Sequence, residues 1–287
     1  MTSRYKHLIS FLIILLVIIF LTYILSIDTL SINEIPIVYL FTSSILILNS
    51  TFFLHSYIYK TDIFFDLVGS LSFLSIGVIS LLLIPNIDAN QILVFFLLLF
   101  WSLRLGPFLF IRRLGANNDE RLEEFFKSPL SLYFLWSMNS LWVFFTSLSM
   151  IIIFSSPNEN EFGLIQWLGL IVWVTGYVIE VISDSQKTKF NKFNKGKFIN
   201  IGLWKYIRHP NYLGEIIIWV GIFIISLNYI HSLTSFLSIL SPIFVFLLLR
   251  FITGVPQLEA RGKEKWGHLD EYNSYKEKTG LLFPKFK

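Results

Sequence analysis

The chain alternates long apolar stretches with short polar connections along its whole length. An α-helix needs about 20 mostly apolar residues to cross the hydrocarbon core of a bilayer. The pattern therefore predicts an all-α fold, an integral membrane helix bundle with about eight transmembrane helices. The expected spans lie near residues 8–27, 36–55, 63–84, 91–111, 131–154, 163–183, 211–228 and 232–253.

The composition supports a membrane protein. Of the 287 residues, 54% are hydrophobic and 15% are charged, whereas soluble domains carry about 25% charged residues. The first apolar stretch follows Arg4 and Lys6 but has no small-residue cleavage site, so we interpret it as a retained span. The chain has no cysteine, which excludes disulfides, thiolate metal sites and a cysteine nucleophile.

The basic residues predict the orientation in the membrane. Eight spans place 22 of the 23 Lys and Arg residues on one side, together with both termini. The other side receives acids such as Asp28 and Asp88, and the remaining cation, Arg104, lies inside a span. Because Lys and Arg favour cytoplasmic loops, we expect both termini in the cytosol. The membrane would be the inner membrane of a bacterium or the endoplasmic reticulum of a eukaryote.

Ionisable side chains gather within or at the ends of the expected spans, all in the cytoplasmic half. Such groups are costly in a bilayer and usually face a cavity or a partner. Their mixed signs predict one polar cavity open to the cytosol. Its cytosolic end would suit an anionic ligand, and its apolar end within the bilayer would suit a lipophilic ligand. Snorkelling to the headgroups is the alternative for Asp184 and Arg250. The six residues are Asp66, Arg104, Glu180, Asp184, Glu215 and Arg250.

The start of the seventh span predicts an anion site. Pro210 favours the first turn of a helix. The backbone donors of that turn, near Asn211 and Tyr212, lie beside Arg208 and His209 in the sequence. Unpaired N–H groups at a helix start attract anions. We therefore expect this turn to bind a phosphate or a carboxylate.

Motifs on both sides of this helix start resemble a known family. Residues 180–190 follow the pattern Glu-x3-Asp-x-Gln-Lys-x2-Phe, and residues 202–215 read Gly-Leu-Trp-x-Tyr-x-Arg-His-Pro-Asn-Tyr-x-Gly-Glu. The tail carries Gly-Val-Pro-x-Leu-Glu at 254–259, followed by Tyr272 and Tyr275. Together these motifs resemble the membrane-bound steroid 5α-reductase-type family in its bacterial-style branch. That family is related to the isoprenylcysteine carboxyl methyltransferase and sterol reductase group.

The resemblance covers residues 100–287 well and is weaker upstream. We therefore predict a single transmembrane domain, 1–287, in which 1–90 holds variable N-terminal spans. Residues 91–287 form the catalytic region that resembles the reductases.

Three upstream positions bear on the chemistry. Asp66 resembles an acid found near that place in the branch, and Trp101-x2-Arg104 resembles the family's Tyr-x2-Arg. Trp101 replaces the tyrosine and has no phenolic proton. Leu122 likewise stands where the branch commonly has a tyrosine.

The resemblance implies a reductase that transfers hydride from NADPH to a C=C bond conjugated to a carbonyl. Arginines would meet the cofactor's phosphates, while acids and amides would fix the ribose and the nicotinamide. The chain has no Gly-x-Gly-x2-Gly fingerprint, so a Rossmann site is not expected. Lys197 stands where the family has an arginine. The implied cofactor-binding residues are Arg104, Glu180, Asp184, Lys197, Tyr206, Arg208, His209, Asn211, Tyr212 and Arg250.

The protein's remaining task would be to polarise the substrate carbonyl as charge develops on its oxygen. A carboxyl group kept protonated by burial can donate the necessary hydrogen bond. Asp66 and Glu215 are the candidates, with Asp66 ranked first. Trp101 would contribute only its indole N–H.

A methyltransferase that uses S-adenosylmethionine is the main alternative. The isoprenylcysteine and phospholipid methyltransferases resemble the same Arg-His-Pro-x-Tyr-x-Gly core, but they commonly carry paired glutamates after the last span. Here Glu259 is followed by alanine. Asn211, Glu215 and the motif at 180–190 favour the reductase.

Other functional classes fit the sequence less well. A transporter usually has midplane charges and internal repeats, and neither is visible. The five histidines are scattered without ligand spacing, so no metal site is expected. We expect a lipophilic small-molecule substrate and membrane lipids as partners, and no nucleic acid. Sterol, isoprenoid and fatty-acyl substrates remain open, as does the oligomeric state.

Overall fold

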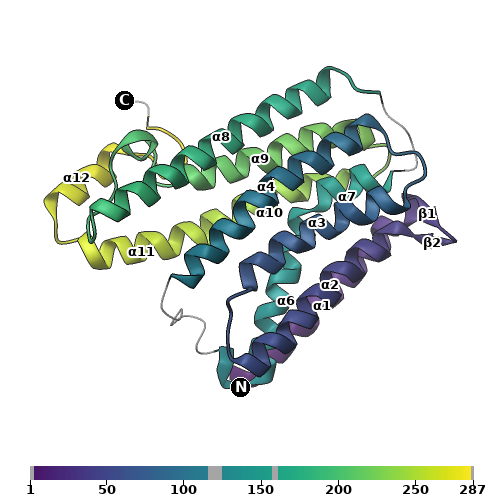
Figure 1. Ribbon diagram of the computed structural model, residues 1–287, viewed down its shortest axis with the longest axis horizontal. Coiled ribbons are helices and arrows are strands. Elements are labelled where there is room, and N and C mark those ends of the chain that lie inside the picture. The colour runs from purple at the N-terminus through teal and green to yellow at the C-terminus, as the bar shows by residue number, and fades with distance from the viewer. Residues whose placement is uncertain (1–2, 116–124, 157–160, 286–287) are drawn as a thin grey trace. The chain divides into compact units, whose positions relative to one another are not determined.

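The computed structural model describes residues 3–115, 125–156 and 161–285, and Leu122 lies outside them. The described chain consists mainly of helices joined by turns and loops, with one short antiparallel hairpin of β1 (Ser31–Ile32) and β2 (Ile35–Pro36) (Figure 1). The predicted all-α fold is confirmed. Two compact units are formed, one by Met1–Phe162 with Ser226–Ile239, the other by Gly163–Ile225 with Leu240–Lys287.

The first unit is a bundle of long apolar helices. In it α1 packs on α6, α2 packs on both α3 and α6, and α3 packs on α4. Short 3₁₀ turns connect several of the helices. The helices are α1 (Ser3–Leu25), α2 (Ile37–Tyr59), α3 (Phe65–Leu83), α4 (Ala89–Leu114), α6 (Pro129–Thr146) and α7 (Leu148–Ser155).

Asp88 fixes the start of α4. Its carboxylate accepts a hydrogen bond from the Gln91 backbone at 2.8 Å, and the Gln91 side chain accepts one from the Asp88 backbone at 3.0 Å. This reciprocal capping box satisfies two backbone donors that a helix start leaves unpaired. The same carboxylate accepts from the Tyr229 hydroxyl at 2.7 Å. This acid therefore has a structural role.

A sharp bend separates α6 from α7. The two helices meet at 57° around Ser147, whose hydroxyl donates to the Phe144 carbonyl at 3.0 Å. A serine that bonds back to the preceding turn bends a helix because it competes with the backbone ladder. Within the described ranges, seven helices are long and apolar enough to span a bilayer, and the bent pair makes an eighth if it counts as one span. This agrees with the predicted number.

The second unit begins with a helix that extends beyond its predicted span. The expected boundary at residue 183 is ten residues too early, and the polar extension carries Asp184. Similarly, the final helical path continues beyond residue 253, so Glu259 lies on a helix. The elements are α8 (Leu164–Phe193), a 3₁₀ turn (Gly202–Lys205), α9 (Pro210–Ser226), α10 (Leu240–Leu247), a π-helical turn (Leu248–Ile252), α11 (Gly254–Trp266) and α12 (Asp270–Lys278).

Glycines bring α8 and α9 into backbone contact, and the two helices run side by side (Figure 1). A Cβ atom on Gly214 would lie 2.7 Å from both the Glu180 nitrogen and the Gly176 oxygen. A second close approach, between Gly169 and Gly221, repeats this contact seven residues along each helix. Small residues at such spacing let two helices approach closely in a membrane.

Candidate functional site

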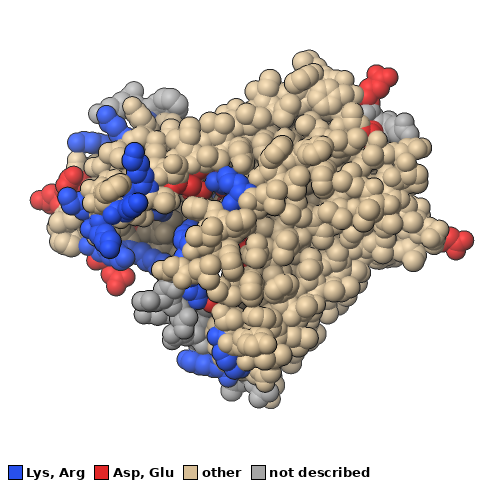
Figure 2. All heavy atoms as spheres, viewed as in Figure 1, with Lys and Arg blue, Asp and Glu red and all other residues tan. Residues whose placement is uncertain are grey.

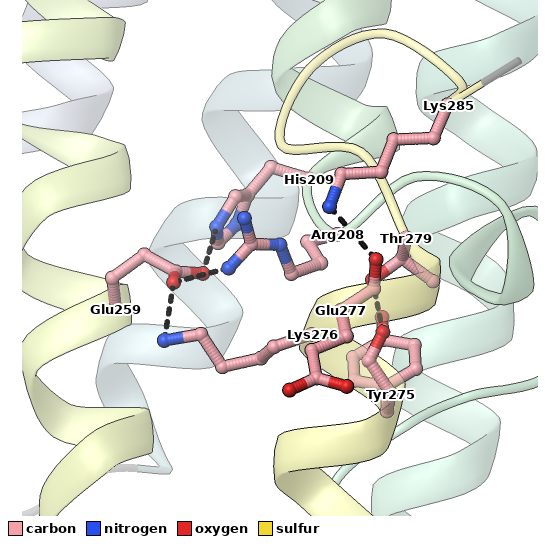
Figure 3. Close-up of polar contacts among 8 residues, drawn as sticks. All are labelled: Arg208, His209, Glu259, Tyr275, Lys276, Glu277, Thr279 and Lys285. Carbon is pink, nitrogen blue, oxygen red and sulfur yellow. Dashed lines mark hydrogen bonds and ion pairs between the residues drawn. The ribbon is translucent and has the colours of Figure 1, made fainter.

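A carboxylate on α11 gathers three nitrogen-bearing side chains (Figure 3). Glu259 Oε2 lies 2.5 Å from Arg208 Nη1 and 3.0 Å from Lys276 Nζ. Its other oxygen, Oε1, lies 3.0 Å from His209 Nε2. The cluster therefore joins α11, α12 and the residues just before α9.

The C-terminal segment holds Arg208 and His209 in place. Their backbone N–H groups donate to the carbonyls of Gly280 and Leu281 at 2.9 and 3.2 Å. Gly280 in turn donates to the Tyr206 carbonyl at 3.3 Å. These bonds form a short parallel bridge that fixes the chain directly before the helix start.

Two aromatic residues, Tyr275 and Trp204, add hydrogen bonds next to this bridge. The Tyr275 hydroxyl donates to the Trp204 carbonyl at 2.7 Å, and the Trp204 indole donates to the Ser183 carbonyl at 3.1 Å. The Lys187 ammonium lies 4.8 Å from the centre of the Trp204 ring. The residues before α9 are thus tied both to α12 and to α8.

Gln186 sets the conformation of the turn before the site. Its side-chain oxygen accepts from the Leu203 backbone at 3.0 Å. Gly202 has a φ of +59°, a conformation that L side chains rarely adopt. A Cβ atom there would also collide with the Gln186 amide. The glycine and the glutamine of the motif therefore act as a pair.

The cluster carries a net positive charge. Arg208 and Lys276 contribute two cations against the single carboxylate of Glu259. Burial lowers the pKa of His209 and outweighs the opposing hydrogen bond to Glu259. Burial also raises the pKa values of Tyr272 and Tyr275. With His209 and both phenols neutral, the balance is one positive charge.

Basic side chains also crowd the surface of this end of the unit. Figure 2 shows Lys and Arg residues gathered over α11, α12 and the C-terminal part of α8. Fields of one sign raise the local concentration of an oppositely charged ligand. This surface therefore favours anions.

Three buried polar atoms at the start of α9 have no hydrogen-bond partner within the described part of the chain. They are Arg208 Nε, His209 Nδ1 and Asn211 Oδ1. A neutral His209 that donates through Nε2 to Glu259 keeps Nδ1 as an acceptor. The helix start thus offers one donor and two acceptors. Unsatisfied buried polar atoms are rare in proteins and destabilise them by about 1–3 kcal/mol each, so three together mark a candidate ligand site.

Other expected cofactor residues lie near this cluster in the same unit. The Tyr212 ring stacks on His209 with the ring centres 5.8 Å apart. Glu180 is 3% exposed and lies where α8 contacts Gly214 of α9. Asp184 lies one turn further along α8 and is half-buried. The structure thus brings the two motifs of the second unit together.

The remaining positions of the second unit differ in exposure. The side chains of Lys197 and Tyr206 are exposed. Glu215 is half-buried on α9. Arg250 lies in the π-helical turn, with its guanidinium 4.8 Å from the centre of the Phe251 ring. Such turns within a helix are frequent at functional sites.

The upstream candidates belong to the first unit. Asp66 occupies the first turn of α3 and is half-buried. Trp101 on α4 is fully buried, and its ring meets Phe73 edge-on at 5.3 Å between centres. Arg104 lies on the same helix and is half-buried.

Sequence reasoning did not predict that Glu259 is central to the cluster. Glu259 is the last residue of the tail motif at 254–259, but the motif contributed only to the family resemblance and did not indicate which residues Glu259 contacts. Tyr275 was likewise part of the resemblance in the tail, whereas Lys276 carried no signal beyond its position in a polar segment. Across the described ranges, no group of three His, Cys, Asp or Glu side chains lies close enough to hold a metal ion.

Comparison with known proteins places the chain in a family. A family model described as "Protein of unknown function (DUF1295)" matches residues 52–279. The chain belongs to the DUF1295 family. An uncharacterised protein of the fission yeast Schizosaccharomyces pombe (strain 972) is 26% identical over 233 residues, which cover 70% of this chain and 65% of the yeast protein. No solved structure matches.

The DUF1295 match includes most of the structure described above. It begins within α2 and ends just after α12, so it contains α3, α4 and the whole Glu259 cluster. The match therefore starts upstream of the region 91–287 that the motifs outlined. The candidate residues of both units lie inside it.

Proposed function

We propose that this DUF1295 protein is a membrane reductase that uses NADPH to reduce a C=C bond conjugated to a carbonyl in a lipophilic substrate. The observation that carries the proposal is the trio of buried, unpartnered atoms at the start of α9. They belong to the motif that resembles the steroid 5α-reductases. NADPH would supply the hydride.

The residues at this helix start offer the types of hydrogen-bond donor and acceptor that such a cofactor requires. Arg208 offers a donor for a phosphate oxygen, and the helix start adds backbone donors. Asn211 Oδ1 is an acceptor of the sort that a carboxamide or a ribose hydroxyl requires. Glu180 and Asp184 on α8 would meet hydroxyl groups, while Lys197 and Arg250 would add positive charge. For Arg104, a cofactor role rests on the motif resemblance alone.

The substrate carbonyl would be activated by a protonated carboxyl group. Asp66 is the first candidate, Glu215 the second, and the Trp101 indole N–H is a further donor. Orientation follows from the basic residues: the termini and the cofactor site would face the cytosol. The protein would thus bind a soluble cofactor from the cytosol and a lipophilic substrate from the membrane.

Glu259 favours a second candidate, a membrane methyltransferase that uses S-adenosylmethionine. A carboxylate in the centre of the cluster repels phosphates, whereas it would attract the amino group of that cofactor. The pairing of Glu259 with Arg208 and Lys276 leaves a net positive charge, which favours NADPH.

The test is a titration of the purified protein, reconstituted in phosphatidylcholine nanodiscs, with NADPH and separately with S-adenosylmethionine. We expect NADPH to bind, and Arg208→Lys and Asn211→Ala each to weaken binding about tenfold. Lys189→Ala, an exposed cation on α8, is the matched control and should bind as the parent does. Binding of S-adenosylmethionine without NADPH would refute the reductase, and unchanged affinity in both variants would refute the site.

A further inference from the structure

A cavity of about 420 Å³ lies in the first unit, at the end of α1 that leads into the β1–β2 hairpin (Figure 1). Its wall is formed by the ends of α1 and α7 and by the segment between α9 and α10. Hydrogen bonds join these segments: the Leu30 N–H donates to the Ser155 carbonyl at 2.7 Å, and the Thr234 hydroxyl donates to the Asp28 carboxylate. All of the wall therefore belongs to the first unit, whereas the Glu259 cluster belongs to the second.

The connections that meet at this end of the unit contain acids but no Lys or Arg. They are residues 26–36, 84–88 and 227–235. The bond from Thr234 to Asp28 holds two of them together, and the Tyr229 hydroxyl, which donates to the Asp88 carboxylate at 2.7 Å, adds the third. A field of this sign attracts cations and repels anions. The ligand of this cavity therefore differs from the anion expected at the start of α9.

Asp28 is the one carboxylate among the described residues of the cavity wall. The hydroxyl groups of Thr234 and Ser232 both donate to it. Ser232 Oγ also lies 2.8 Å from Thr234 Oγ1 and 3.2 Å from Ser235 Oγ, so the four side chains form one connected cluster. A carboxylate has about four acceptor sites. The exposed acid therefore keeps acceptor sites for a ligand.

The hydroxyl protons of this cluster are already used within the protein. Those of Thr234 and Ser232 go to Asp28, and that of Ser235 goes to the Ser232 carbonyl at 2.9 Å. What the cluster still offers is oxygen acceptors and a negative charge. The matching ligand group is therefore a hydrogen-bond donor that carries a positive charge.

A primary ammonium group meets this requirement, because it has three N–H donors and a positive charge. A quaternary ammonium has no such donor and is usually bound in a cage of aromatic rings, whereas the described wall contributes just two rings, those of Tyr229 and His231. Calcium takes about six to eight oxygen ligands, usually from several carboxylates, and Asp28 is a single one. A bare ion would also leave most of a cavity of this volume unfilled.

The surroundings of the cluster favour a lipid over a soluble amine. Leu25 is the last residue of α1 and Ile27 is 62% exposed, and both line the cavity. The cavity thus lies where an apolar span meets the head groups. His231 lines it too, and the described residues give its ring no hydrogen bond. An imidazole ring offers an N–H donor in either protonation state, which suits a lipid phosphate.

We propose that this cavity binds the head group of a phospholipid that carries a primary amine, as phosphatidylethanolamine does. Asp28 pairs with the ammonium, His231 donates to the phosphate, and Leu25 and Ile27 contact the lipid below its head group. The site goes beyond the proposed reductase. Because its residues belong to the first unit alone, either proposal can fail without the other.

Lipid binding to the full chain in detergent, after removal of co-purified lipid, tests the proposal. The probes are phosphatidylethanolamine and phosphatidylcholine with the same acyl chains, measured by native mass spectrometry. We expect phosphatidylethanolamine to bind about fivefold more tightly, the factor that one ion pair open to solvent contributes. Equal affinity for the two lipids would overturn the proposal. Phosphoethanolamine should bind more weakly than the lipid, and equal affinity for it would overturn the assignment to a lipid.

Two variants separate the two ends of the head group. Asp28→Asn should lower the affinity for phosphatidylethanolamine to that for phosphatidylcholine. His231→Ala should weaken both lipids about fivefold and leave their ratio unchanged. A preference that persists in Asp28→Asn would overturn the assignment.

Glu34→Gln is the matched control, because it neutralises an exposed acid of the same connection outside the cavity wall. It should bind both lipids as the parent does. Loss of the preference in this variant would show a general effect of surface charge and would also overturn the proposal. If a variant does not fold, the ratio of the two lipids on the parent protein still decides the question.

Discussion

His209 Nε2 lies 3.0 Å from Glu259 Oε1, across 50 residues of chain. The same carboxylate pairs with Arg208 and Lys276. One acid on α11 therefore fixes the two residues that precede α9, and α12 supplies the third partner.

Glu259→Gln tests which cofactor the cluster holds. Loss of the carboxylate removes its ion pairs and should lower the free energy of unfolding by about 1.5–3 kcal/mol. It also removes a negative charge beside the anion site, so NADPH should bind about tenfold more tightly. Isothermal titration in nanodiscs measures this. Tighter binding supports the reductase, whereas lost binding of S-adenosylmethionine supports the methyltransferase.

The stability of the protein should depend on pH through His209. Its pKa in the folded protein is lowered by burial from the ordinary value of 6.5. The unfolded chain then binds more protons than the folded one as the pH falls through 6.5, so stability rises with pH in this window. The melting temperature in detergent, measured between about pH 5 and 8, should fall at the acidic end.

The control for this pH dependence is His209→Gln. Glutamine keeps a donor for Glu259 but does not titrate, so the fall in melting temperature between neutral and acidic pH should be smaller. An identical pH profile in the variant would assign the dependence to another group.

Gly214→Ala tests the close contact between α8 and α9. The added Cβ would lie 2.7 Å from the Glu180 nitrogen and the Gly176 oxygen, so the helices must separate. Overpacking of this kind destabilises a protein by about 1–3 kcal/mol. Thermal unfolding measures the loss, and affinity for NADPH should fall because Asn211 begins the same helix.

Gly115→Ala is the matched control for that variant. Its φ is −86°, and its Cβ would find no atom nearer than the Arg112 and Ile111 carbonyls at 3.9 Å. It should therefore unfold as the parent does. Equal stability of both variants would mean that the α8–α9 contact is looser than described.

Tyr275→Phe tests the tie between α12 and the turn before α9. It removes the hydroxyl that donates to the Trp204 carbonyl at 2.7 Å and keeps the ring. We expect a loss of about 1 kcal/mol in unfolding free energy, together with faster amide hydrogen exchange at Arg208 and His209. Unchanged exchange there would show that the bridge to Gly280 holds without the tyrosine.

The motifs of the second unit were visible in the sequence because they are local. Pro210 suits the first position of α9 because its φ is already helical. Gly202 suits its turn because it adopts a positive φ. Each requirement is met by a single residue, so it can be recognised in the sequence. The hydrophobic pattern likewise predicted the spans, because a bilayer demands about 20 apolar residues wherever a helix crosses it. The ends of α8 and of the last helical path were predicted too early, since polar helical turns that leave the apolar region carry no hydropathy signal.

The pairing of Glu259 with Arg208, His209 and Lys276 was decided by the tertiary structure alone. Residues about 50 positions apart meet there because α11 returns beside the start of α9, and no spacing in the sequence encodes that return. The unsatisfied atoms of His209 and Asn211 are equally invisible in a sequence, since satisfaction depends on every neighbour. The sequence by itself determined the membrane class, the helical fold and the motif at the start of α9. Only the packing determined which charges meet and which buried atoms are left for a ligand.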